Sequence, residues 1–149
     1  IAHAMTTLMA QNKGAKKTDR IKAAFRCGMN IELFYGIFIF FVCFFLAHPL
    51  MQLFSNDPVV CKHGVTYLKL ISLMYLFPAV TNGVQGYFRG IGDLKITLIS
   101  SFVNMSVRVI FAAVLVFHFS LQIEALPFSY LAGWIGMLLA EVPLLLRKF

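Results

Sequence analysis

The sequence predicts an all-α integral membrane protein, an antiparallel bundle of transmembrane helices with four full spans and one truncated helix. The first observation is composition: 60% of the residues are hydrophobic and 13% are charged, against about 25% charged residues in soluble domains. The second is length, because four apolar stretches reach the roughly 20 residues that a transmembrane helix needs. These stretches also lack the alternation of apolar and polar residues that barrel strands show.

The apolar stretches define the expected elements in order. Residues Ile1 to Ala10 are expected to be the last turns of a helix that begins before this sequence. The four full spans are expected at Ile31 to Phe54, Val65 to Phe88, Leu94 to Phe119 and Leu126 to Leu146. Each is predicted to be a helix, because a helix satisfies its own backbone polar groups inside lipid.

Glycines mark two of the connecting turns. Gly14 is expected to end the first helix in the left-handed conformation. Gly90 and Gly92 should permit a tight reversal between two antiparallel spans, and Asp93 should cap the helix that follows. The turns therefore predict short loops between neighbouring spans.

The charges indicate a membrane surface and not a nucleic-acid partner. The net charge is +7, and the basic residues lie in short segments between the apolar runs. The segment from Lys13 to Arg26 carries six basic residues and one acid, which places it in the cytoplasm by the positive-inside rule. The outer loops are expected around Asp57 and Glu124. The alternation predicts a multi-pass protein of the inner (plasma) membrane with a cytoplasmic C-terminus.

A polar face is predicted on the span that begins at Leu94. Thr97, Ser101, Asn104 and Arg108 recur at helical spacing and therefore share one side of the helix. Two interpretations remain open. The face is either a packing seam, with Arg108 reaching toward the outer headgroups, or part of a transport cavity. In both cases we expect it to face other helices or a cleft instead of lipid.

The preceding span carries a similar face. Pro78, Asn82, Gln85 and Arg89 lie on one side of it, and Pro78 predicts a bend because it removes a backbone hydrogen bond. Asn82 is either a structural partner for the freed carbonyl or a ligand contact. Tyr75 is a candidate aromatic wall beside it.

Two acids lie inside spans and are candidates for ion coupling. They are Glu32 in the first full span and Glu141 in the last. The alternative is an ion pair, of Glu32 with Arg26 and of Glu141 with Arg147-Lys148. No span carries paired carboxylates, a His cluster or a Ser/His/Asp set, and the three cysteines form no CxxC pair, so neither an enzyme, a cofactor nor a metal site is predicted.

Two loop strings carry a resemblance to a known family. They are Gln11-Asn12-Lys13-Gly14-Ala15 and Arg89-Gly90-Ile91-Gly92-Asp93, with Tyr67-Leu68 between them and Gly133-Trp134 after them. In this order they resemble the multidrug and toxic-compound extrusion (MATE) family. The resemblance implies a two-lobe transporter of twelve helices, of which residues 1–149 would form part of the C-terminal lobe, from the end of helix 8 through helices 9 to 12.

The resemblance also implies a function: a secondary active exporter of drugs or toxic organic compounds, driven by Na⁺ or H⁺. Its expected partners are membrane lipids, small and often cationic organic substrates, and the missing N-terminal lobe. The residues expected to contact substrate are Tyr75, Asn82, Ser101, Asn104 and Arg108. A lipid-linked oligosaccharide flippase and a non-transporting structural membrane subunit remain as alternatives.

The sequence departs from the family pattern at two positions. No acid lies between Asp57 and Asp93, where some members carry a coupling carboxylate. Arg108 is followed by Val109 and Ile110 where relatives often have proline two residues on, so no proline kink is expected there.

Overall fold

The computed structural model describes residues 1–119 and 125–148, and within these ranges every regular element is an α-helix. The helices are α1 (Ala2–Gly14), α2 (Thr18–Phe45), α3 (Ala47–Gln52), α4 (Pro58–Leu73), α5 (Leu76–Gly90), α6 (Leu94–Phe117) and α7 (Ala125–Leu146). Three of them, α2, α6 and α7, are long and apolar enough to cross a membrane. α4 and α5 reach the same length and apolar character only as a pair, which is bent by 52°. The predicted all-α membrane bundle is confirmed.

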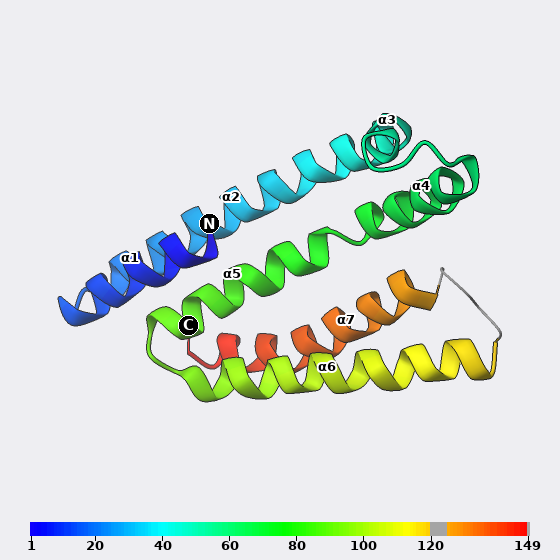
Figure 1. Cartoon of the computed structure of the whole chain (residues 1–149). Coiled ribbons are helices and arrows are strands. Elements are labelled where there is room, and N and C mark those ends of the chain that lie inside the picture. Colours follow the sequence, from blue (N-terminus) through cyan, green and yellow to red (C-terminus); the bar gives the residue numbers. More distant parts are fainter. Residues whose placement is uncertain (120–124, 149) are drawn as a thin grey trace.

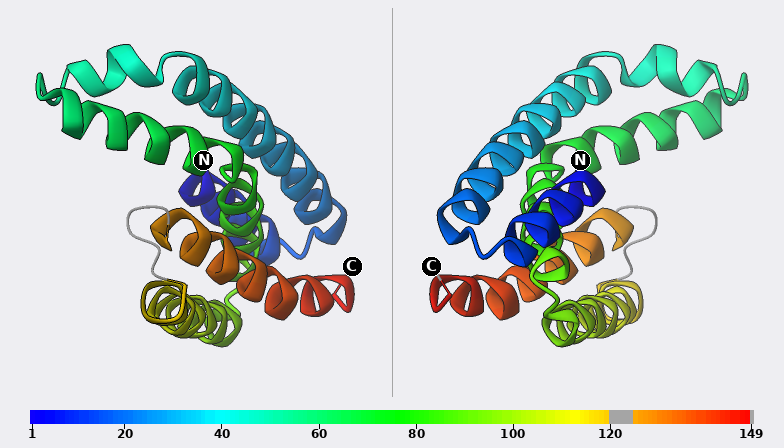
Figure 2. Two further views of the ribbon diagram at one scale, coloured as in Figure 1. Left: turned by 90° about the vertical axis from the view of Figure 1, so that its right-hand side faces the viewer. Right: turned by 90° about the vertical axis from the view of Figure 1, so that its left-hand side faces the viewer.

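α5 forms the centre of the bundle. It packs against α1 and α2 on one side and against α6 and α7 on the other, while α6 and α7 form a long antiparallel pair (Figures 1 and 2). Most residues in the second half of α5 are buried, and Phe88 and Val84 belong to a core shared with Met5 and Met9 of α1. The other helices present large apolar side chains outward, as expected of surfaces that face lipid or further protein.

The first full span begins earlier than its apolar stretch. The prediction placed its start at Ile31, but α2 begins at Thr18. Its first turns contain Arg, Lys, Ala and Met, which are good helix formers, so the helix extends beyond the apolar segment. At the other end the span is interrupted at Leu46, and α3 follows as a separate short helix.

The first helix ends at Gly14, as predicted, but Gly14 does not adopt the predicted left-handed conformation. The positive φ of 55° occurs at Lys16 instead. Gly92 does adopt a positive φ of 76°, as its predicted turn requires. Asp93 makes no capping hydrogen bond to α6; it forms a salt bridge with Lys148 near the C-terminus.

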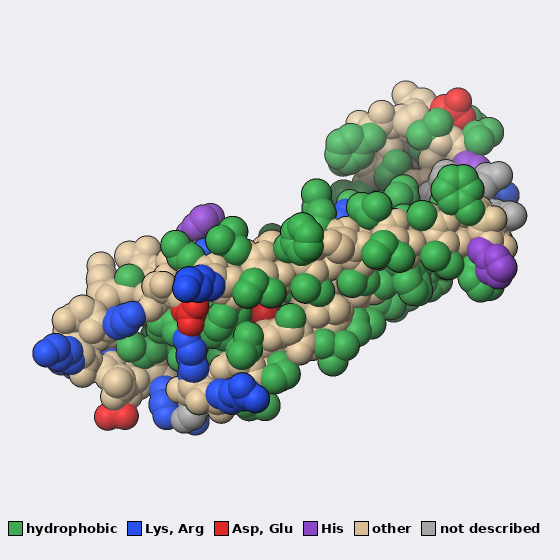
Figure 3. Space-filling view, turned by 90° about the horizontal axis from the view of Figure 1, so that it is seen from below, with side chains coloured by type: hydrophobic (Ala, Val, Ile, Leu, Met, Phe, Trp, Pro, Cys, Tyr) green, Lys and Arg blue, Asp and Glu red, His purple; other side chains and the backbone are tan. Residues whose placement is uncertain are grey.

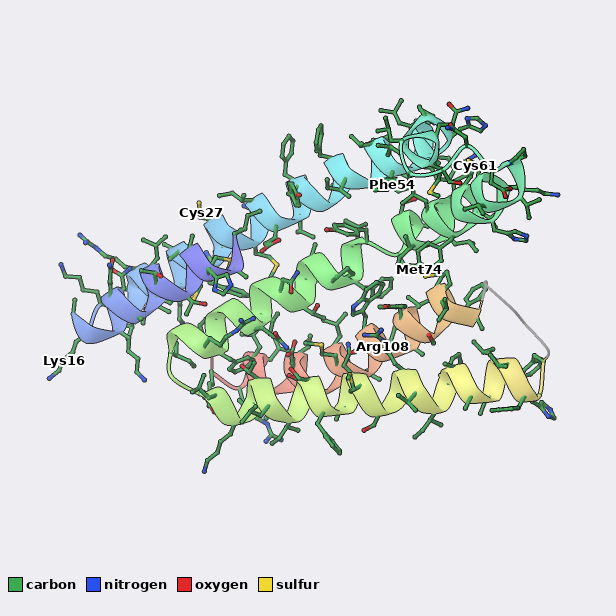
Figure 4. All side chains as sticks on the ribbon, in the orientation of Figure 1. Lys16, Cys27, Phe54, Cys61, Met74 and Arg108 are labelled. Atoms are coloured by element: carbon green, nitrogen blue, oxygen red, sulfur yellow. The ribbon has the colours of Figure 1, made fainter. Side chains whose placement is uncertain are left out.

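The second full span is broken four residues before its proline. α4 ends at Leu73 and α5 begins at Leu76, with Met74 at the break (Figure 4). Pro78 cannot donate to the carbonyl of Met74, and its ring crowds that carbonyl. The backbone amide of Phe77 donates to the Met74 carbonyl instead, at 3.1 Å. The predicted bend is confirmed. It lies at Met74 because the carbonyl of Met74 is the one that Pro78 leaves without its helical hydrogen-bond donor.

α6 and α7 agree closely with their predicted ranges. α6 begins at the predicted Leu94 and ends at Phe117, and α7 begins one residue before Leu126. The predicted outer-loop residue Glu124 lies outside the described residues. Lys and Arg side chains gather at the end of the bundle where α1 turns into α2 (Figure 3). There Lys13 also donates to the carbonyl of Ile91, which ties α1 to the turn between α5 and α6.

Candidate functional site

A polar cavity lies between α1, α2 and α5, and we call it the α2–α5 pocket. It has a volume of about 670 Å³. Its polar lining residues are His3, Glu32, Tyr35, Tyr75, Asn82 and Arg89. The structure thus brings together three residues that the sequence singled out separately: Glu32 as an ion-coupling candidate, and Tyr75 and Asn82 as substrate contacts.

Close helix packing positions Glu32 in this pocket. A Cβ placed on Gly36 of α2 would lie 3.1 Å from the Cβ of Ala79, so the two helices approach closely there. Glu32 is one turn earlier on α2, with its side-chain stem beside Gly83 of α5, and it is only 6% exposed. Its carboxyl group lies next to the backbone of Ala2. The predicted ion pair with Arg26 is wrong, since no such salt bridge occurs among the described residues.

The lining of the α2–α5 pocket suits an organic cation. Glu32 supplies a carboxyl group, and Tyr35 and Tyr75 supply ring faces, which attract cations through their quadrupoles. Asn82 offers both a donor and an acceptor. Few, convergent polar groups in a concave site of several hundred Å³ are typical of small-molecule sites.

The polar face of α6 packs against neighbouring helices, as predicted, but it lies away from this pocket. The guanidinium of Arg108 lies 3.6 Å from the centre of the Tyr130 ring on α7 (Figure 4). Asn104 donates to the sulfur of Met137 on α7 at 3.3 Å, and Ser101 accepts a hydrogen bond of 3.4 Å from Gln85 on α5. The geometry is that of a packing seam, and the substrate role of these three residues stays a prediction.

Arg108 needs no route to the headgroups in this arrangement. Its stem covers Gly133 so closely that a Cβ there would lie 2.4 Å from the Arg108 Cγ. Its guanidinium is held over an aromatic face, which compensates part of the cost of a cation within a span. Arg108 and Tyr130 also line a separate small cavity of about 220 Å³.

Glu141 occupies a third location, between α5, α6 and α7. Its side chain is 0% exposed, and neither carboxyl oxygen has a hydrogen-bond partner among the described residues. Ser100 and Gln85 are its polar neighbours, and Arg89 is the charge that acts on it. The predicted pairing with the basic C-terminus is wrong, because Lys148 turns to Asp93 instead.

The sequence alone did not single out Tyr35, Tyr130 or a pocket role for Arg89. Tyr35 follows Glu32 by three residues and so shares its helix face, a signal that was available. Arg89 follows Asn82 by two turns and was placed on its face, but its position at a helix end favoured a structural role. Tyr130 contacts Arg108 because of how α6 and α7 are aligned along each other. The residue pattern of a single helix does not specify that alignment.

Metal-binding geometry is not found in the part of the chain that the structure describes. No group of three or more His, Cys, Asp or Glu side chains gathers there in a way that could hold a metal ion. The three cysteines are free: Cys27 and Cys43 lie on α2, and Cys61 lies on α4.

The spans, with polar pockets between them, define a multi-pass helical membrane protein. The MatE family profile matches residues 1–114, and the chain belongs to this family. Among curated proteins it is 27% identical over 139 residues to a probable multidrug resistance protein NorM of Thermotoga maritima, a match that covers 93% of this chain and 28% of that protein. It is also 29% identical over 105 residues to the lipid II flippase MurJ of Bacillus subtilis, covering 67% of this chain and 19% of the flippase.

A solved structure supports the same fold. An inward-facing multidrug resistance MATE family transporter of the MOP superfamily superposes with a TM-score of 0.85 at 16% identity. The superposition covers 98% of this chain and 34% of the transporter. The chain therefore spans about a third or less of the length of the proteins that it matches.

Proposed function

We propose that this chain is part of a secondary active exporter of organic compounds, many of them cationic, and that the α2–α5 pocket contributes to its substrate site. One observation carries the proposal: a buried carboxyl, Glu32, shares a cavity between spans with Tyr35, Tyr75 and Asn82. Membership of the MatE family and the similarity to NorM support export as the activity. The rest of the transporter, including the presumed N-terminal lobe, would complete the cavity.

The exporter is proposed to exchange its substrate for an inward-moving cation, Na⁺ or H⁺, across the plasma membrane. Glu32 and Glu141 are the buried carboxyl groups that could bind such a cation. We propose that the end of the bundle that holds Lys13 and Lys148 faces the cytoplasm. The gathering of Lys and Arg side chains at that end supports this orientation (Figure 3).

Efflux of ethidium, a fluorescent organic cation, tests the proposal. Cells that produce the full-length transporter should lower their ethidium content, and Glu32→Gln should reduce this export at least several-fold at matched abundance in the membrane. Asp19→Asn is a matched control because Asp19 is exposed in the first turn of α2, outside the pocket. Export unchanged by Glu32→Gln would refute the role of the pocket.

A flippase for lipid-linked oligosaccharides is the second candidate, and the similarity to MurJ favours it. Such a substrate carries phosphates, which require cationic groups for binding. The α2–α5 pocket offers Arg89, but the carboxyl of Glu32 lines the same pocket. Competition separates the two candidates. If ethidium is the better model of the substrate, excess lipid-linked pyrophosphate should leave ethidium export unchanged, whereas strong inhibition would favour the flippase.

A further inference from the structure

Glu141 is buried and forms no salt bridge among the described residues, and Ser100, Gln85 and Arg89 are the polar groups near its carboxyl. Its side chain is fully enclosed by α5, α6 and α7, and both of its oxygens lack hydrogen bonds among the described residues. An isolated carboxylate in such a place is strongly disfavoured, whereas a neutral carboxyl group is tolerated. A second orphan group lies one turn before Ser100: the hydroxyl of Thr97, which is also buried and has no partner within the described part of the chain.

The hydrogen bonds around Glu141 favour a neutral, protonated carboxyl. Gln85 accepts from Arg89 through its amide oxygen at 3.0 Å, and its amide nitrogen points to Ser101 and to the sulfur of Met137. Ser100 donates its proton to the carbonyl of Thr97 at 3.2 Å. Ser100 therefore retains lone pairs and has no proton left to donate. The hydroxyl of Ser100 suits a carboxyl that donates a proton.

We propose that Glu141 is a proton-binding site, linked to the α2–α5 pocket through Arg89. Arg89 lines that pocket and at the same time contacts Gln85, which is a neighbour of Glu141. The link rests on the proposed export function, whereas the proton site itself does not.

Arg89 then has two positions, one for each protonation state of Glu141. While Glu141 holds its proton, the Arg89 guanidinium stays on Gln85 and keeps a positive charge at the α2–α5 pocket. When the carboxyl transfers its proton to water, the resulting carboxylate attracts the guanidinium toward α7. The pocket then loses a positive charge, so an organic cation beside Glu32 binds more tightly. A proton at Glu141 and a cationic substrate in the pocket therefore oppose each other.

Few other charges face Glu141. On α5, Arg89 is the charged residue that acts on the Glu141 carboxyl. α6 carries two charged residues: Lys95 in its first turn, and Arg108, whose guanidinium lies over the Tyr130 ring.

The other neighbouring segments add few charges. Lys148, near the end of α7, is paired with Asp93. α4 contacts α7 near Leu126, at the end of α7 that is far from Glu141. His3 and Glu32 face Arg89 across the α2–α5 pocket, and Arg147 follows the end of α7.

Infrared difference spectra between acidic and alkaline buffers test the proton site directly. The purified full-length transporter in lipid should show carbonyl stretches of protonated carboxylic acids, and Glu141→Gln should remove one of these bands while Glu32→Gln leaves that band in place. Asp19→Asn should retain it. Ser100→Ala should keep the band and move it to higher frequency, because the acid loses its acceptor. A band unchanged in both Glu141→Gln and Ser100→Ala would overturn the proposal.

Ethidium binding at different pH values tests the link through Arg89. The affinity of the wild type should rise roughly tenfold as Glu141 loses its proton. The affinity should begin at the weak value in Glu141→Gln and at the tight value in Arg89→Gln, and both variants should lose most of this pH dependence, because only Glu32 in the pocket can still take up a proton. A pH dependence in Glu141→Gln as large as that of the wild type would overturn the link. If the wild type does not bind ethidium at all, the proposed substrate class fails, while the infrared result still decides the proton site.

Discussion

Arg108 illustrates how a cation is accommodated inside a span of this protein. Its guanidinium lies over the Tyr130 ring and its stem covers Gly133, so both the charge and the aliphatic part have partners on α7. A cation over an aromatic face contributes about 0.5 kcal/mol when exposed and about 2 kcal/mol or more when desolvated. The residue is therefore expected to act first on stability, by joining α6 to α7.

We predict that Arg108→Ala and Tyr130→Leu each lower the stability of the full-length protein by about 1–2 kcal/mol, because each removes the same cation–π contact. The double variant should lose little more than either single variant, which a double-mutant cycle on thermal unfolding in detergent would measure. Tyr130→Phe is the control, since it keeps the ring. Fully additive losses would contradict the contact, and altered export at unchanged stability would restore Arg108 to the substrate site.

Of the six polar residues that line the α2–α5 pocket, three were named as site residues from the sequence alone. Glu32 of α2, proposed for ion coupling, does converge with Tyr75 and Asn82, which were proposed together as substrate contacts of the next span. Ser101, Asn104 and Arg108 were grouped with them because polar residues inside a span suggest a cavity. The same pattern also arises from polar contacts between helices. Only the register of α6 against α7 separates the two cases, and a single helix does not contain that information.

Helices α1 and α5 are held together by small residues at their contact. A Cβ on Gly90 would lie 2.6 Å from the Met9 Cβ and 2.9 Å from the backbone oxygen of Thr6. The Thr6 hydroxyl also donates to the carbonyl of Gly86 at 3.2 Å. Neither obstacle at Gly90 is the end of a flexible side chain, so the helices would have to move apart to admit a larger residue.

We predict that Gly90→Ala destabilises the protein by about 1–3 kcal/mol, the usual cost of overpacking a tight contact. Gly14→Ala is the matched control, because nothing lies within 4 Å of a Cβ at Gly14. Gly14 has no positive φ, so alanine should leave stability unchanged or raise it slightly. Thermal unfolding of both variants checks this, and equal stability of the two would show that α1 and α5 do not approach as described.

The ends of a helix could be predicted where the length of its apolar stretch sets them. They were harder to predict where helix propensity or a proline sets them. The start of α6 and the end of α7 agree with their apolar stretches. The start of α2 does not, because Thr18 to Asn30 is polar enough to look like a loop yet favours a helix. The break at Met74 was foreseen only as a bend at Pro78, since the affected carbonyl lies four residues before a proline.

The whole molecule combines a central helix with two different surroundings. α5 lines the α2–α5 pocket on one side and contacts α6 and α7 on the other. Arg89 and Gln85, on successive turns of α5, connect the two sides through a hydrogen bond of 3.0 Å. A change of charge near α7 can therefore reach the pocket through one side chain. In this arrangement α5 contacts both the proposed proton site at Glu141 and the proposed substrate pocket.

The MatE family and the helical membrane fold are established for this chain, whereas the exchange of substrate for a cation is proposed. Coupled exchange is reversible, so a substrate gradient must drive the cation in the opposite direction. The coupling can therefore be measured by imposing a gradient of a model substrate such as ethidium and recording the cation flux that it drives. Recording Na⁺ and H⁺ in the same experiment identifies the cation.

The most direct test is to impose an ethidium gradient across proteoliposomes that contain the full-length transporter and to record Na⁺ and H⁺ movement with ion-sensitive dyes. The account predicts that ethidium moving down its gradient drives one of the two cations the opposite way, and that Glu32→Gln suppresses both fluxes while Asp19→Asn does not. Ethidium flux without movement of either cation, or coupled flux that survives in Glu32→Gln, would contradict it.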